Sequence, residues 1–364
     1  MIPVPLRRAG LVVTAALAAL LALATPAAAH GADAPDGTDY RVTLTGLSPA
    51  PAGLTVRVVE AGARLELTNR TGRDVEVLGY SGEPYLRVGP GGVYENSRSP
   101  ATYLNQTLAG DTSLSSEADP AATPVWYRLD PGRSVRWHDQ RTRWLESSPP
   151  PQVSADPGRE QRIRDWVVPL RVGTETVEVR GTLDWVPPPD AYPWWVAATL
   201  GFLAIGAAGL APAGTTAGTR ALRGVGALLA LGGAAAVVFT VGRELDAGSA
   251  GIGGVLVGLV GGQIWALLTG FGAIAAGGYA LTRREAADFA LALAGACLAI
   301  FGGFANVAVL SRSVVPVAWP PTTARILVTL VLATGAGAVA AGVLRLHAAA
   351  RTAPRPAQPV PTPR

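Results

Sequence analysis

The sequence predicts an integral membrane protein in three parts: an export signal, an all-β extracytoplasmic domain folded as an Ig-like antiparallel sandwich, and an α-helical transmembrane bundle of about five helices. Three observations predict this fold class. Hydrophobic residues make up 49% of the 364 residues and charged residues only 15%, which lies between a soluble globule and a wholly embedded protein. Almost all Asp, Glu and Tyr residues precede Pro193, whereas Ala-, Gly-, Leu- and Val-rich runs follow it. A short apolar run at the N-terminus ends in small residues.

Residues 1–29 have the pattern of a signal peptide. Arg7 and Arg8 form a basic start, an apolar run covers 11–24, and Ala27-Ala28-Ala29 supplies small residues for cleavage. The apolar run is too short to cross a bilayer comfortably, so we expect cleavage after Ala29 rather than an uncleaved anchor. The mature chain would then begin at His30, which offers a free amino group and an imidazole on one residue.

Residues 30–186 are expected to form the extracytoplasmic β-sandwich. Short runs of alternating polar and apolar residues, separated by turn residues, predict antiparallel strands. The expected strands are 41–47, 54–60, 64–69, 75–80, 125–129, 134–137, 167–172 and 176–185. We expect 63–80 to form a hairpin with its turn at 69–74, because Leu and Val alternate with charged residues on both sides of that turn. The less regular stretch 83–148 is where a binding loop is expected.

The segment around His138 carries the second histidine of this domain. His138 and Asp139 offer an imidazole and a carboxylate, and the flanking Trp137 and Trp144 would exclude water. Together with the amine and imidazole of His30, these groups suit square-planar Cu(II), so His30, His138 and Asp139 are the predicted metal ligands and copper the expected cofactor. The alternative is that His138 is an ordinary hydrogen-bonded residue of an Arg- and Trp-rich strand.

The same segments carry a family resemblance. The run 79–105, the Trp137-His138-Asp139 core and the start at His30-Gly31 resemble an uncharacterised actinobacterial family of multi-pass membrane proteins with an exported β-sandwich domain. The family pattern implies further histidines at two positions where this chain has Gln140 and Arg143. A more distant resemblance, in architecture and in the N-terminal histidine, is to copper-resistance proteins of the CopC and CopD type, and it implies a role in copper handling.

The second half of the chain is predicted to cross the membrane. The expected spans are 194–210, 224–241, 252–281, 289–310 and 326–346, and the long third one is expected to tilt or break near Gly261-Gly262. A Pro-rich linker, 187–193, precedes them, and a disordered cytoplasmic tail, 347–364, follows. Arg residues concentrate in alternate loops, which places the β-domain outside the cell and the C-terminus in the cytoplasm. Gln263 and Asn306 are expected to form interhelical hydrogen bonds.

Several function classes are disfavoured by the composition. All 30 basic residues are Arg and the net charge is only +4, so nothing indicates a nucleic-acid partner. Cys297 is the only cysteine, and no nucleophile elbow, phosphate-binding loop or zinc-type histidine cluster indicates an enzyme. The expected function is therefore ligand binding, with Cu(II) as the candidate ligand, in envelope metal handling. The expected partners are the bilayer and another exported or membrane protein. The alternative is a cell-envelope scaffold or interaction protein with no metal role.

Overall fold

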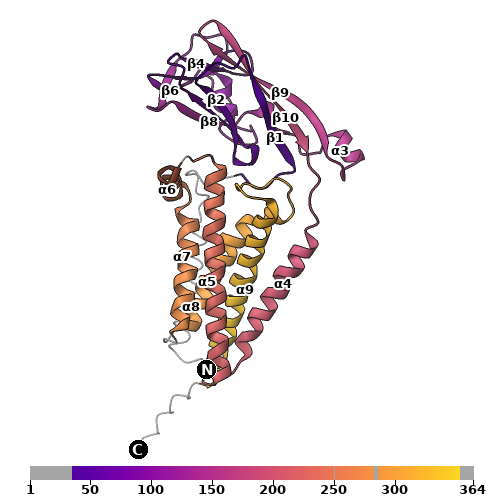
Figure 1. Cartoon of the computed structure of the whole chain (residues 1–364), viewed down its shortest axis with the longest axis vertical. Coiled ribbons are helices and arrows are strands. Elements are labelled where there is room, and N and C mark those ends of the chain that lie inside the picture. Colours follow the sequence, from indigo (N-terminus) through magenta and orange to yellow (C-terminus); the bar gives the residue numbers. More distant parts are fainter. Residues whose placement is uncertain (1–34, 250, 283–285, 353–364) are drawn as a thin grey trace, which may run out of the picture.

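The computed structural model describes residues 35–249, 251–282 and 286–352, which form a β-domain seated on one end of a helical bundle (Figure 1). The β-domain, residues 35–186, contains two antiparallel sheets. The larger sheet has the spatial order β1 (Tyr40–Ser48), β10 (Glu175–Trp185), β9 (Gln161–Val172), β4 (Val75–Leu78), β5 (Pro84–Gly89), β6 (Gly92–Asn96) and β7 (Trp126–Asp130). The smaller has the order β2 (Leu54–Val59), β3 (Arg64–Asn69) and β8 (Ser134–Trp137).

Both sheets contribute to one hydrophobic core. Leu65 and Leu67 of β3 lie in the same buried cluster as Val75 and Val77 of β4, and all four are at most 1% exposed. Successive strand residues point to opposite faces of a sheet, so the alternation in the sequence places these side chains inward. The prediction of an antiparallel β-domain is confirmed, and the Ig-like assignment stays a prediction. Two short helices, α2 (Pro100–Leu104) and α3 (Pro151–Ala155), and two 3₁₀ turns, η1 (Glu60–Gly62) and η2 (Gln140–Thr142), complete the domain.

The predicted hairpin over 63–80 is wrong. β3 pairs with β2 and β8, whereas β4 pairs with β5 and β9 in the other sheet. Asn69 holds the crossover between them: its side-chain N–H donates to the carbonyls of Arg73 and Val88, both at 2.7 Å, and its Oδ1 accepts from the Thr71 amide. The alternation was identified correctly, but it specifies only which side chains point inward and not which strand pairs with which.

The helices match the predicted spans. They are α4 (Tyr192–Ala207), α5 (Thr216–Asp246), α6 (Gly251–Gly262), α7 (Ile264–Leu281), α8 (Ala287–Cys297) and α9 (Pro321–Thr352). A 3₁₀ turn, η3 (Ala208–Leu210), extends α4, and π-helical and 3₁₀ turns, η4 (Leu298–Gly303) and η5 (Phe304–Leu310), extend α8. With these extensions, five helices among the described residues are long and apolar enough to cross a membrane.

The third expected span, 252–281, is not one helix: α6 ends at Gly262 and α7 begins at Ile264, so of the two alternatives, tilt or break, the structure has the break, and only α7 is long enough to cross a membrane. At 12 residues α6 is about 18 Å long, too short to cross a bilayer. Figure 1 shows α6 beside the end of the bundle that faces the β-domain. The four other expected spans correspond to α4, α5, α8 with its extensions, and α9.

Glycine lets α5 and α7 approach closely, as expected from their composition. A Cβ at Gly226 would lie 2.8 Å from the carbonyl oxygen of Gly277, and one at Gly233 would lie 2.5 Å from that of Gly270. The two pairs are seven residues apart on each helix, so they lie on the same face. Small residues at such contacts permit the backbone packing that holds membrane helices together.

The β-domain is fastened to the bundle by backbone and side-chain bonds. Thr38 and Val314 exchange two backbone hydrogen bonds of 2.8 Å, which ties the chain before β1 to the loop before α9. Asp39, only 2% exposed, forms an ion pair with Arg312 and accepts from the Ser313 amide at 3.0 Å. The Ser313 hydroxyl also donates to the carbonyls of Val186 and Pro187, at the other end of the β-domain. One loop of the bundle therefore fixes both ends of the domain.

We expect Asp39→Ala to loosen this attachment. The substitution leaves the half-buried Ser313 amide without its acceptor and Arg312 without its partner, at a cost of about 2 kcal/mol. Hydrogen–deuterium exchange of the full-length protein in detergent should then accelerate by about tenfold or more in the peptides that carry Thr38 and Val314. The control is Glu178→Ala, which removes a surface ion pair with Arg180. Unchanged exchange in Asp39→Ala would contradict the proposed role of the carboxylate.

Candidate functional site

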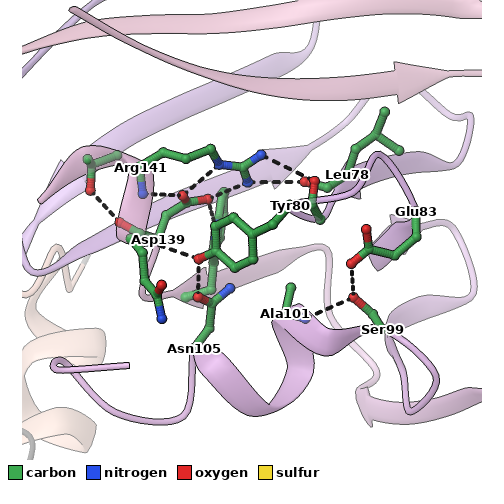
Figure 2. A network of polar contacts seen from close by, with 12 residues as sticks. Leu78, Tyr80, Glu83, Ser99, Ala101, Asn105, Asp139 and Arg141 are labelled. Carbon is green, nitrogen blue, oxygen red and sulfur yellow. Dashed lines mark hydrogen bonds and ion pairs between the residues drawn. The ribbon is translucent and has the colours of Figure 1, made fainter. Parts of the chain in front are cut away.

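The segments that the sequence singled out meet in one buried polar network (Figure 2). The Asp139 carboxylate is fully buried and accepts from Arg141 Nε and Nη2, both at 2.8 Å, and from Trp137 Nε1 at 3.0 Å. The Tyr80 hydroxyl donates to Asn105 Oδ1 and accepts from the Gln140 amide. Arg141 also donates to the Leu78 carbonyl, and its guanidinium lies 5.0 Å from the centre of the Tyr80 ring. Residues 78–80, 105 and 137–141 are thus held together.

A second group of bonds adjoins the first. The Ser99 hydroxyl donates to Glu83 Oε1 at 2.6 Å, and its oxygen accepts from the Ala101 amide at the start of α2. Burial, with the nearby Asp139 carboxylate as the next cause, raises the pKa of Tyr80 above its ordinary value. Asn105 Nδ2 is buried without a hydrogen-bond partner among the described residues, whereas its Oδ1 accepts from Tyr80. The remaining bonds hold Tyr80, Asp139 and Arg141 in fixed positions and stabilise the β-domain.

Near this network, Glu95 of β6 is a half-buried carboxyl whose burial raises its pKa to about 7. In the unfolded chain the group titrates near its ordinary value of about 4.3. Between these two values the native state holds a proton that the unfolded chain has lost. Stability therefore falls as the pH rises through this window.

We expect Glu95→Gln to remove this pH dependence. The variant should exceed the parent by about 1–2 kcal/mol in unfolding free energy at pH 8, after allowance for solvent screening of a half-buried group, and should equal it at pH 4. Urea unfolding of the full-length protein in detergent, followed by near-UV circular dichroism, measures both values. Glu146→Gln, at an exposed position, is the control. If Glu95→Gln raised the unfolding free energy equally at both pH values, the ionisation of Glu95 would not be the cause of the pH dependence.

The predicted copper ligands have the following positions. His138 is 4% exposed; its Nδ1 lies 2.8 Å from the Ala63 carbonyl oxygen and its Nε2 lies 3.2 Å from Arg64 Nε. A carbonyl accepts and a guanidinium donates, so the proton is on Nδ1 and Nε2 is the acceptor. The Asp139 carboxylate is bonded to Arg141 and Trp137, and His30 lies outside the described residues.

These contacts fit a metal only in part. A histidine that donates from Nδ1 to a carbonyl is oriented as metal ligands are, with Nε2 as the donor atom. In this structure the Arg64 guanidinium is bonded to Nε2, so a Cu(II) ion at this atom requires Arg64 to move. Within the described ranges there is no group of three or more His, Cys, Asp and Glu side chains arranged to hold a metal. The copper site stays a prediction.

Arg64 connects this region to the boundary with the bundle. Its Nη1 donates to both carboxylate oxygens of Glu60, at 2.9 and 3.0 Å. Glu60, Ala61 and Gly62 have φ values of 56°, 53° and 90°, a left-handed conformation that strains the first two residues. The amide of Ala61 donates to Asp246 Oδ2 at 2.7 Å, so the end of α5 holds this turn in place.

A cleft of about 390 Å³, here called the boundary cleft, lies where the β-domain meets the bundle. Six charged side chains line it, three from the β-domain (Glu60, Arg64 and Arg136) and three from the last turn of α5 (Arg243, Glu244 and Asp246). Val257 and Gly258 of α6 and the break at Gly261–Gln263 form another wall. Arg243 is held there by Asn306 Oδ1 at 2.9 Å and by the Pro35 carbonyl at 3.2 Å.

An adjoining cleft of about 360 Å³ shares Pro35 and Glu60 with the boundary cleft. Tyr40, Trp144 and Arg143 line it, and burial lowers the pKa of Arg143 to about 10. The Nε of Arg143 has no hydrogen-bond partner among the described residues.

Sequence reasoning did not identify the boundary cleft. The expected interhelical role of Asn306 is supported by its bond to Arg243 of α5, whereas Gln263 lies at the helix break and lines the cleft. The only signal in the sequence was the group Arg243, Glu244 and Asp246 directly after an apolar run. Nothing local showed that β3 and β8 would come to lie beside it.

Comparison of the chain with protein-family models, with curated proteins and with solved structures gives no match. The functional site is therefore inferred from the geometry of the clefts and from the chemistry of the side chains that line them.

Proposed function

We propose that the chain is a multi-pass membrane protein of the cell envelope whose extracytoplasmic β-domain and helical bundle bind a ligand together, in the boundary cleft. This proposal depends on one observation: both parts of the protein line the cleft, with three charged side chains from the β-domain and three from α5. Charged groups that are buried away from water, as Glu244 is, are costly unless they are paired or hydrogen-bonded, and ionisable groups within membrane segments often mark a ligand path.

The proposed orientation follows from the predicted topology. If all five candidate spans cross the membrane, their odd number puts the β-domain and the end of α9 on opposite sides, which supports this orientation. Arg220 and Arg223 in the first turns of α5, and Arg345 and Arg351 in the last turns of α9, then lie on the cytoplasmic side, as the positive-inside rule expects. Cleavage of the signal peptide after Ala29 and an Ig-like sandwich are part of this proposal.

We expect a bulky side chain at Gly261 to block the cleft. Gly261 lines the cleft and a Cβ there meets no atom within 4 Å, so Gly261→Phe should fill space without a clash. Native mass spectrometry of the purified full-length protein should show a bound small molecule or lipid in the parent, and at least about tenfold less of it in Gly261→Phe.

The matched control is Gly272→Phe, in the exposed face of α7, where a Cβ also meets nothing within 4 Å. Equal retention in the two variants would place the bound molecule elsewhere. A parent protein that retains nothing would count against a binding function and favour the scaffold alternative.

Copper handling is a second candidate, favoured by the Nδ1–Ala63 contact that orients His138 as a metal ligand. On this proposal Cu(II) gives a nitrogen-rich type 2 electron paramagnetic resonance signal with the full-length protein, and His138→Ala weakens the signal. Arg64→Gln should strengthen it, because the substitution removes the guanidinium bonded to Nε2. A signal no greater than background in both the parent and Arg64→Gln would exclude His138 as a ligand.

A further inference from the structure

Glu244 is a buried carboxylate that lines the boundary cleft. It is 7% exposed and accepts a hydrogen bond from the Ser249 hydroxyl, and within the described ranges no Arg side chain forms an ion pair with it. Gly258 of α6 makes room for this carboxylate, since a Cβ at that position would collide with it. A buried carboxylate without a cationic partner is unfavourable, so a bound ammonium group would be strongly stabilised there.

The side of the cleft that the β-domain forms carries an excess of positive charge. Glu66 of β3, whose side chain is 8% exposed, accepts from Arg57 Nε at 3.0 Å and from Arg136 Nε at 2.9 Å. Two guanidinium groups therefore share one carboxylate, which leaves one positive charge in excess. Arg136 lines the cleft and bonds to Glu66 through Nε, so its two terminal NH₂ groups remain for a phosphate.

The third wall is apolar and open. Val257 lines the cleft and is 74% exposed, and α6 also exposes Ile252 at 83% and Val260 at 63%. Trp265, at the start of α7, is 76% exposed, and tryptophan is enriched where membrane proteins meet the lipid headgroups. On the proposed membrane topology these exposed apolar side chains face lipid, and the cleft opens toward the acyl chains.

We propose that the boundary cleft binds the zwitterionic headgroup of a phospholipid from the leaflet beside the β-domain, with its amine at Glu244 and its phosphate at Arg136. This inference rests on the proposed function, because it takes the boundary cleft to be the ligand site. The three Arg and three carboxylate side chains of the lining balance in charge, which favours a zwitterionic headgroup over an anionic one. Phosphatidylethanolamine has the required chemistry.

The test uses the full-length protein in nanodiscs that contain equal amounts of phosphatidylethanolamine and phosphatidylglycerol with the same acyl chains. After gentle extraction, native mass spectrometry should show phosphatidylethanolamine retained in preference to phosphatidylglycerol. Glu244→Gln should lower its retention about tenfold, since the amide can still accept from Ser249 but carries no charge. Arg136→Gln should lower it similarly. The control is Glu175→Gln, at a surface position 3.9 Å from Arg73.

Each outcome separates this inference from the proposed function. Equal retention of the two lipids, or no effect of Glu244→Gln, overturns the headgroup assignment. Displacement of the lipid by millimolar O-phosphoethanolamine overturns the lipid source and identifies a soluble ligand with the same chemistry. A different bound molecule that Gly261→Phe excludes overturns the inference while supporting the proposed function. No retained molecule of any kind overturns both.

Discussion

The attachment of the β-domain to the bundle is the constraint on which the other features depend. Thr38 and Val314 pair through two backbone hydrogen bonds, as two strands do, and Asp39 is buried against the same loop. Ser313 reaches the carbonyls of Val186 and Pro187 as well, so the start and the end of the domain share one anchor. Two attachment points in one loop restrict rotation more than the single linker before α4 could. Together with the bond from the Ala61 amide to Asp246, this restriction fixes the spacing of the walls of the boundary cleft.

The buried polar network has a different role. It joins the segments that follow β4 and α2 to the η2 turn, through the side chains of Tyr80, Asn105, Asp139 and Arg141. A network of this kind is costly when one member is missing, because the remaining charge or dipole stays buried. It positions His138, one residue before Asp139, with its ring against Ala63 and Arg64. The Trp137-His138-Asp139 motif thus stabilises the β-domain. It does not line the boundary cleft, but it contacts Arg64, which does.

The sequence predicted those parts of the fold that leave a periodic or compositional pattern. β3 and β8 have the expected bounds because their apolar and polar residues alternate strictly. β5 and β6 were missed within the segment taken for a loop, since Pro84, Gly89 and Gly92 resemble turn residues and neighbouring positions are buried in pairs. The helices followed from their apolar runs, and the break before Ile264 from two adjacent glycines.

Contacts between segments that are far apart in the sequence could not be predicted. Asn69 fixes the crossover through the carbonyl of Val88, 19 residues away, and no local pattern specifies that partner. Arg64 and Asp246 are 182 positions apart in the chain, yet both line the same cleft. The charged residues at the end of α5 directly follow its apolar run in the sequence. Their relation to Glu60, Arg64 and Arg136 depends on how the domain sits on the bundle, which tertiary contacts alone decide.

The strained turn at Glu60–Gly62 explains how the two halves maintain this arrangement. Positive φ values at Glu60 and Ala61 are unfavourable and persist only where surrounding contacts compensate. Here Arg64, within the β-domain, binds the Glu60 carboxylate. Asp246, in the bundle, accepts a hydrogen bond from the Ala61 amide. Separation of the domain from α5 would remove the second contact and leave the strain. The turn is therefore stable in this conformation when the domain is docked, and its carboxylate then lies in the cleft beside the three Arg side chains.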